Sequence, residues 1–415
     1  MVEFLSFSLY NRRRNPKIRE NDMKRAVFSI LVLALFMLCA CGKDKMTAEG
    51  ENDKGLAYYN SGDYETARAY FERALKIEPT NKEVLNNYGM VLIQLREYDL
   101  ALEQFAAVIT PSAEGTKAMK RNKFAYRGQG IAYMQKLEFE KALQSFINAL
   151  AISTESGWNV DIMYYKANAQ ECLGNTDEAI STYTQVLEMD PKNVNALCSR
   201  ANLYRERGDY SRALEDYEVA LARSEGSYQS YLGLYSCYRD QGQDEKAAKT
   251  LDTASRLKIN NNEDKYLLGQ VHFYQKNYTS AKIEMQNAVE NGFTEAYYFL
   301  GEIALYEKCY EEAIAYYDNY RASILSTSPT VCNQEAVCYL ALFDYDKASE
   351  MIEMGLAFGA SSARQQLLRN RIAVLEGRCD FAGAYDAFQT YIVEFPGDNE
   401  AIREYKFVKK RLGLE

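Results

Sequence analysis

The chain has 415 residues, of which 47% are hydrophobic and 26% are charged, so it has ample material for a folded core. An ordinary globular protein of this length splits into two or three domains, whereas an array of repeats grows lengthwise around one continuous core. The formal net charge is −9. An acidic surface repels phosphate backbones, which argues against nucleic acid as a general partner.

The N-terminal segment has the order of a secretory signal peptide. Met23-Lys24-Arg25 is basic, residues 26–40 carry no charge, and small residues follow at Ala40 and Gly42. The uncharged run is shorter than the roughly 20 residues that a membrane-spanning helix needs. We therefore expect a signal peptide over 23–40 and interpret residues 1–22 as an upstream extension from a mis-assigned start at Met1. A genuine start at Met1 with a long basic region is the alternative.

The end of this segment, Leu38-Cys39-Ala40-Cys41, resembles the lipobox of bacterial lipoproteins. The resemblance implies that Cys41 carries lipid, that residues 41–47 form a tether, and that the protein is anchored on the extracytoplasmic side of the cell membrane. An uncleaved anchor, or lipid on Cys39, is the alternative. Without residues 1–40 the net charge becomes −13, because those residues hold seven Lys/Arg and three Asp/Glu.

Cysteines do not indicate a metal site or a disulfide framework. Seven follow Cys41, an odd number, and no CxxC pair occurs. Most fall in predicted helices, where a free thiol packs as a small apolar group.

A repeat fills most of the remaining chain, and alanine marks it. The markers are Ala67, Ala101, Ala142, Ala179, Ala213, Ala247, Ala281, Ala313, Ala348 and Ala384, separated by 34, 41, 37, 34, 34, 34, 32, 35 and 36 residues. A large apolar or aromatic side chain follows each marker by four residues, and a glycine or alanine often precedes it by twelve. Small residues at this spacing allow two antiparallel helices to approach closely while the large residue fills the space beside them.

Glycines five residues before the marker are expected where the first helix of each pair stops and the chain reverses. Prolines twelve residues after it end the second helix. The segment GLAYYNSGDYETARAYFERALKIEP, from Gly55 to Pro79, resembles the tetratricopeptide repeat in nearly every signature position.

This resemblance implies an all-α, right-handed α-solenoid of about ten helical hairpins over residues 48–398. The units are predicted to start near residues 48, 82, 123, 160, 194, 228, 262, 294, 329 and 365. Residues 399–415 are predicted to form a capping helix, since terminal repeats need a polar outer face. The longest gaps place extra residues around 112–119 and 153–159, and the second insert holds Trp158, which we expect to be buried against the adjoining hairpin.

No catalytic pattern is present. The chain has one histidine, His272, and lacks a Gly-x-Ser-x-Gly elbow, an HExxH helix and a nucleotide-binding phosphate loop. The acidic run at residues 260–264 lacks the central glycine of a calcium-binding loop. We therefore predict a non-catalytic protein without metal, nucleotide or other cofactor.

The family resemblance implies that residues fifteen, eleven and eight before each marker line a concave binding groove, because this spacing puts them on one helix face. The stripe is polar in the middle units and aromatic further on. Its members are Tyr164, Asn168 and Glu171; Cys198, Asn202 and Arg205; Leu232, Ser236 and Arg239; Tyr266, Gln270 and Phe273; and Tyr298, Glu302 and Leu305.

We expect Asn168 and Asn202 to hold an extended peptide by its backbone, with Arg205 and Arg239 meeting an acidic group. Their removal is expected to weaken partner capture without lowering thermal stability. The predicted function is that of a scaffold that gathers protein or peptide partners in the cell envelope. The alternative is a lipoprotein of an envelope assembly or export system that binds a glycan or small ligand, with Tyr266, Phe273 and Tyr298 as stacking platforms.

Overall fold

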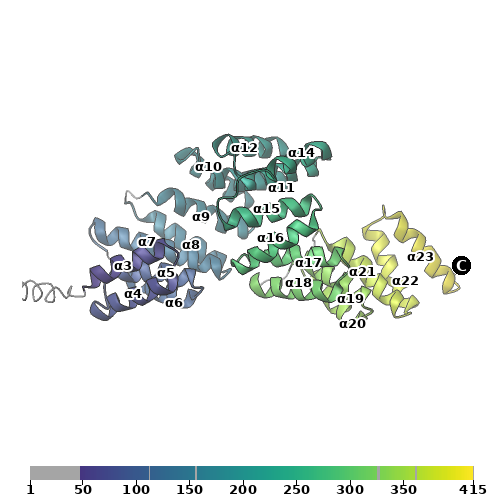
Figure 1. Ribbon diagram of the computed structural model, residues 1–415. Helices are drawn as coiled ribbons and strands as arrows, with labels where there is room; N and C mark the ends of the chain where they lie inside the picture. Colours follow the sequence, from purple (N-terminus) through teal and green to yellow (C-terminus); the bar gives the residue numbers. More distant parts are fainter. Residues whose placement is uncertain (1–46, 112, 155–156, 325–327, 360–361, 415) are drawn as a thin grey trace, which may run out of the picture. The chain divides into compact units, whose positions relative to one another are not determined.

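The computed structural model describes residues 47–111, 113–154, 157–324, 328–359 and 362–414. Over these residues the chain forms helices α3 to α23 and no strand, which confirms the predicted all-α class (Figure 1). Contacts divide the chain into two compact units that meet in sequence between Asp190 and Pro191. The predicted signal peptide and Cys41 lie outside the described residues.

The N-terminal unit consists of four helical hairpins. They are α3 (Ala48–Asn60) with α4 (Tyr64–Ile77), α5 (Lys82–Gln94) with α6 (Tyr98–Val108), α7 (Thr116–Gln135) with α8 (Phe139–Ala151), and α9 (Asn159–Cys172) with α10 (Thr176–Met189). Each second helix also packs against the first helix of the next hairpin, and successive first helices touch. The hairpins therefore stack through both layers.

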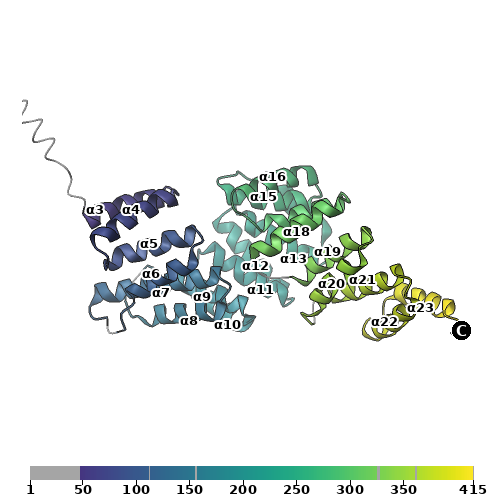
Figure 2. The same cartoon turned by 90° about the horizontal axis from the view of Figure 1, so that it is seen from below.

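The C-terminal unit repeats the same plan (Figure 2). Its helices are α11 (Val194–Glu206) and α12 (Tyr210–Arg223), α13 (Tyr228–Asp240) and α14 (Asp244–Ala254), α15 (Asn262–Tyr274) and α16 (Tyr278–Glu290), α17 (Ala296–Tyr306) and α18 (Tyr310–Ile324), α19 (Pro329–Ala341) and α20 (Tyr345–Leu356), α21 (Arg364–Gly377) and α22 (Phe381–Glu394), and α23 (Asn399–Arg411). The last helix buries Ala401 and Val408 in a cluster with residues of α21 and α22.

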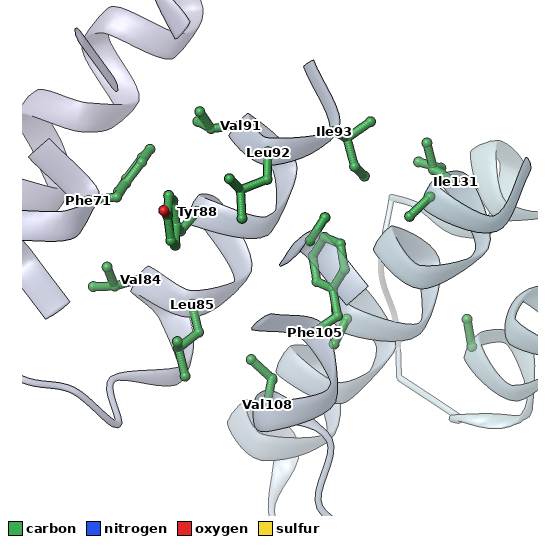
Figure 3. Packing of buried hydrophobic residues seen from close by; sticks show 14 of the residues in the cluster. Phe71, Val84, Leu85, Tyr88, Val91, Leu92, Ile93, Phe105, Val108 and Ile131 are labelled. Carbon is green, nitrogen blue, oxygen red and sulfur yellow. The ribbon is translucent and has the colours of Figure 1, made fainter. Parts of the chain in front are cut away.

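The repeat pattern has the packing role that its spacing predicts. All ten marker alanines are buried. In the first hairpin a Cβ built on Gly55 would lie 2.7 Å from the Phe71 ring, so glycine is required for the close approach. Phe105 fills the corresponding space in the second hairpin, among Leu92, Val108 and Ile131 (Figure 3). The small residue and the large one thus form one packing unit.

The turn inside each hairpin places the residue five before the marker in the left-handed region. Gly62, Gly174, Gly208 and Gly242 have φ between +69° and +82° there, which confirms the expected role of these glycines. The other six hairpins have the same backbone conformation with a non-glycine residue: Arg96, Leu137, Lys276, Lys308, Phe343 and Cys379, at φ between +59° and +62°. These residues accept a conformation that costs L-amino acids about 1–2 kcal/mol, so the reversal is required even where glycine is absent.

Helix α7 contains part of the longest insert. It has 20 residues and begins at Thr116, whereas a start near residue 123 was predicted. The extra residues thus extend the helix at its N-terminus instead of forming a loop alone. Trp158 directly precedes α9 and is 37% exposed, so the expected burial is only partial.

Among the residues that the structure describes, no helix is both long and apolar enough to span a membrane.

Candidate binding surface

The predicted stripe lies on the first helix of successive hairpins. In the N-terminal unit Tyr164, Asn168 and Glu171 belong to α9 and are half-buried. In the C-terminal unit the half-buried members are Asn202 and Arg205 of α11, Ser236 of α13, Tyr266 and Phe273 of α15, and Tyr298 of α17, while Arg239 of α13 is exposed. Helix geometry thus puts these residues at similar depth on equivalent faces within each unit.

Both asparagines already have a partner inside their own hairpin. The buried Tyr183 of α10 donates its hydroxyl to Asn168 Oδ1 at 2.7 Å and lies 2.8 Å from Glu171 Oε2. The buried Tyr217 of α12 donates in the same way to Asn202 Oδ1. Burying a hydroxyl without a partner costs about 1–3 kcal/mol. Removing Asn202 would leave the buried Tyr217 hydroxyl without this acceptor, so the contact argues against unchanged stability there. Tyr183 would keep Glu171 as an acceptor, so unchanged stability on removal of Asn168 stays a prediction.

The same contact accounts for the polar residue opposite each packed tyrosine. Tyr317 of α18 donates to Glu302 at 2.7 Å, so all three hairpins with tyrosine four residues after the marker have a hydrogen-bond acceptor opposite it. The four hairpins with phenylalanine there have an apolar residue opposite: Phe71 with Leu56, Phe105 with Met90, Phe146 with Ile131, and Phe388 with Ala373. Among these seven hairpins, the stripe has an acceptor where the packed ring carries a hydroxyl.

Both arginines of the stripe also have partners. Arg205 donates to Asp240 at 2.7 Å. Arg239 donates to the Tyr235 hydroxyl at 2.8 Å, and its Nε lies 3.8 Å from Asp244. Aspartates of the repeat therefore already neutralise the charges that were expected to meet an acidic ligand.

The aromatic members of the stripe pack against other rings. Tyr266 stacks on Phe293 with centroids 5.4 Å apart, and Phe273 meets Phe299 edge-on at 5.2 Å. Tyr298 lies 5.8 Å from the Tyr320 ring. Burial raises the pKa of the Tyr266 and Tyr298 hydroxyls above the usual value. These rings pack against one another, so they present their edges to a ligand more than open faces on which it could stack.

A pocket that the sequence interpretation did not predict lies in the N-terminal unit. It has a volume of about 520 Å³ and is lined by residues of α5 and α7 together with Trp158. The 41-residue gap and the single tryptophan were its two sequence signals. Neither showed that the lengthened α7 would bring basic residues beside that ring.

The described residues show no cluster suited to a metal ion, and the histidine and most cysteines are packed. They contain no group of three His, Cys, Asp or Glu side chains able to hold a metal ion. His272 is half-buried, and burial lowers its pKa. Cys198, Cys237, Cys332 and Cys338 are buried free thiols whose pKa burial raises to between about 11 and about 12, as expected for packing residues.

Antiparallel hairpins stacked through small residues, with neighbouring first helices in contact within each unit, define a helical-repeat protein. One family model of the tetratricopeptide repeat matches residues 52–115, 164–228 and 266–324, and a second model of the same repeat matches residues 204–270. Together these matches cover more than half of the chain. The chain belongs to the tetratricopeptide repeat family.

Similarity to individual proteins is more distant. The chain is 27% identical over 213 residues to DnaJ homolog subfamily C member 3 of Gallus gallus, a match that covers 48% of this chain and 41% of that protein. It is 22% identical over 235 residues to the Hsp70-Hsp90 organizing protein of Triticum aestivum, covering 56% and 39%. The matches thus span less than half the length of these relatives. A solved tetratricopeptide repeat protein from Parabacteroides merdae is 17% identical, with a TM-score of 0.41, over 70% of this chain and 98% of that one.

Proposed function

We propose that this chain is a non-catalytic scaffold that binds other polypeptides on the first-helix faces of its hairpins, tethered by lipid on Cys41 outside the cytoplasmic membrane. The observation that carries the binding function is the repeat itself. Within each of the two units, successive hairpins pack through equivalent contacts, and the first helices keep a half-buried, chemically mixed surface. Extended concave surfaces of this kind suit polypeptide ligands.

In this proposal the stripe provides mainly contact area to the bound polypeptide and few directed hydrogen bonds. Its asparagine oxygens accept hydrogen bonds within their own hairpins, Arg205 bonds to Asp240 of the next hairpin, and Arg239 bonds to Tyr235. Its tyrosines and apolar side chains provide contact area for a bound segment. Directed recognition then needs groups that have no partner in the chain itself.

The envelope location rests on the sequence from Met23 to Cys41. One acyl chain holds a protein weakly on a membrane, whereas two or three hold it stably, as on a lipoprotein cysteine. The expected partners are therefore proteins of the cell envelope or exported proteins.

The binding proposal is tested by capture from envelope extract. The tagged full chain in detergent is expected to retain specific polypeptides that the same chain, unfolded on the resin, does not. A parallel glycan array tests the alternative, and binding of defined glycans with no retained polypeptide would overturn the proposal. The internal ring packing of Tyr266, Phe273 and Tyr298 gives the glycan alternative no further support.

The tether is tested by metabolic labelling with palmitate in a bacterial host. Cys41→Ala is expected to abolish labelling. The matched control Cys39→Ala is expected to retain labelling, because Cys41, the predicted lipid acceptor, is unchanged. Labelling that persists in Cys41→Ala and disappears in Cys39→Ala would assign the lipid to the other cysteine.

A further inference from the structure

The pocket in the N-terminal unit exists because of the chain's irregularities. Helix α7 has 20 residues, against 11 to 14 in the other first helices, and its additional N-terminal turns form one wall. The buried Lys123 holds the neighbouring segment in place, because its amine donates to the Ile152 carbonyl at 3.0 Å. Trp158 follows that segment and lines the pocket.

The floor of the pocket is aromatic. Trp158 meets the Phe124 ring edge-on with centroids 5.0 Å apart, and Trp158 remains 37% exposed. A partly exposed tryptophan beside a second ring is a favourable anchor for a large apolar side chain, because it offers wide contact area and few rotatable bonds.

The α7 wall of the pocket is basic. Lys117, Lys120 and Arg121 line it, and Glu83 of α5 is the one acidic residue of the pocket lining. Arg121 lies 3.7 Å from Glu83. Lys117 and Lys120 are exposed, and no ion pair is recorded for either in the described part of the chain. In a protein of strongly negative net charge, this local excess of positive charge favours an anionic ligand.

One buried polar atom at the pocket has no partner. Asn86 is 4% exposed, and its Nδ2 donates to the Arg121 carbonyl at 3.1 Å, which fixes the orientation of the amide. Its Oδ1 atom is buried without a hydrogen-bond partner, as is Nε of Arg121. Buried polar atoms are nearly always paired in folded proteins, so the unpaired acceptor indicates a donor supplied by a ligand.

We propose that this pocket binds an extended acidic segment of another polypeptide. A large apolar side chain of the segment lies on Trp158 and Phe124, and a neighbouring Asp or Glu carboxylate meets Lys117 and Lys120. A backbone N–H of the segment donates to Asn86 Oδ1. Polypeptides combine these three features within a few residues, and the inference rests on the proposed scaffold function while naming the chemistry of the partner.

The test uses the tryptophan itself, since Trp158 is the only one in the chain. The full chain in detergent is titrated with a blocked peptide, acetyl-Gly-Phe-Asp-Glu-Leu-Gly-amide, while tryptophan emission is followed. A saturable change is expected, and its midpoint is expected to rise at least tenfold when Asp and Glu of the peptide become Asn and Gln. Replacing Phe and Leu of the peptide by Ala is expected to remove the response.

Variants of the protein locate the effect. Lys117→Glu with Lys120→Glu is expected to weaken binding at least tenfold, while Lys117→Arg with Lys120→Arg retains it. A matched double reversal elsewhere, Lys249→Glu with Lys258→Glu, is expected to bind as the wild type does, which separates the pocket from net charge. All six lysine substitutions fall on exposed side chains, and helical circular dichroism checks the fold.

Equal binding of the acidic and amide peptides, or equal binding by the wild type and the Lys117→Glu/Lys120→Glu variant, would overturn the pocket assignment. The scaffold proposal has a separate readout. If envelope polypeptides are still captured by the charge-reversed variant, the pocket inference fails and the scaffold function stands. If the wild type captures none, the scaffold function fails as well.

Discussion

Two kinds of hairpin account for seven of the ten in this chain, and their packed rings differ at one atom. In the first three hairpins Phe71, Phe105 and Phe146 fill the space between the helices, and the facing stripe residue is apolar. In three later hairpins the ring is a buried tyrosine, and the facing residue is Asn168, Asn202 or Glu302. The fold is the same, and in these six hairpins the facing residue is a hydrogen-bond acceptor where the ring carries a hydroxyl.

This difference shows that a recurring polar residue on a repeat surface can serve the hairpin's own packing and need not bind a ligand. An asparagine recurring at 34-residue spacing has the appearance of a ligand-binding ladder, yet each one here accepts a hydrogen bond from the core. By contrast, Asn86 at the α5–α7 pocket has an oxygen that no group of the described chain pairs. An unpaired buried atom is a stronger sign of a ligand than a repeated paired one.

The largest predicted effect concerns Glu335, a buried carboxylate that lacks the hydrogen bond found at Glu302. Glu335 of α19 is fully buried, and neither of its oxygens has a hydrogen-bond partner, although Arg321 lies 3.1 Å away. Burial raises its pKa to about 7, Arg321 opposes the shift, and Asp318 adds to it. Because the folded-state pKa exceeds the unfolded value of 4.5, the contribution of Glu335 to stability is most favourable below pH 4.5 and is lost as pH rises to about 7.

Glu335→Gln should remove this loss, which amounts to about 3 kcal/mol at most. Urea midpoints at pH 5 and pH 8 measure it. The urea midpoint of the variant relative to that of the wild type is expected to rise from pH 5 to pH 8. The exposed Glu350→Gln control is expected to follow the wild type. A constant difference between variant and wild type would show that Glu335 does not titrate in this range.

The next effect converts one kind of hairpin into the other. Phe105→Tyr places a hydroxyl opposite Met90 with no acceptor, and the cost is expected to be about 2 kcal/mol of unfolding free energy. Adding Met90→Asn supplies the acceptor and should recover at least half of that cost. Chemical denaturation of the two single variants and the double variant gives the coupling, and simple additivity would contradict the pairing rule.

The smallest effect concerns the reversal inside each hairpin. Phe343 has φ +60° and is 75% exposed, at the place where Gly208 has φ +75°. Phe343→Gly is expected to stabilise the protein by up to about 1 kcal/mol, because glycine adopts this conformation without strain. Gly208→Ala should destabilise by a similar amount. A shift of both melting temperatures in the same direction would contradict this account of the turn.

The sequence predicted the hairpins well because their spacing reflects direct contacts. Each marker alanine and each large residue four positions later lie in the core, so one periodic signal located both. The six non-glycine turns were missed because Arg96 or Phe343 carries no signal of a left-handed conformation, which the surrounding packing imposes.

The candidate site was harder to predict because it depends on where an insert folds. The sequence placed extra residues around 112–119 and a unit start near 123, yet from Thr116 these residues extend α7 and bring Lys117 and Lys120 to the aromatic floor. The stripe asparagines were identified as surface residues, but their hydrogen bonds to Tyr183 and Tyr217 join positions fifteen residues apart on two helices. Periodicity along one helix does not reveal that contact.

Partner recovery by two matched variants tests the central claim most directly. Asn202→Leu with Tyr217→Phe removes the polar group of the stripe together with the hydroxyl that needs it, so the hairpin becomes the phenylalanine kind and stays folded. Lys117→Glu with Lys120→Glu changes only the exposed charges of the pocket. The account predicts that the stripe variant captures envelope polypeptides as the wild type does, while the pocket variant loses most of them. Loss by the stripe variant with full recovery by the pocket variant would contradict it.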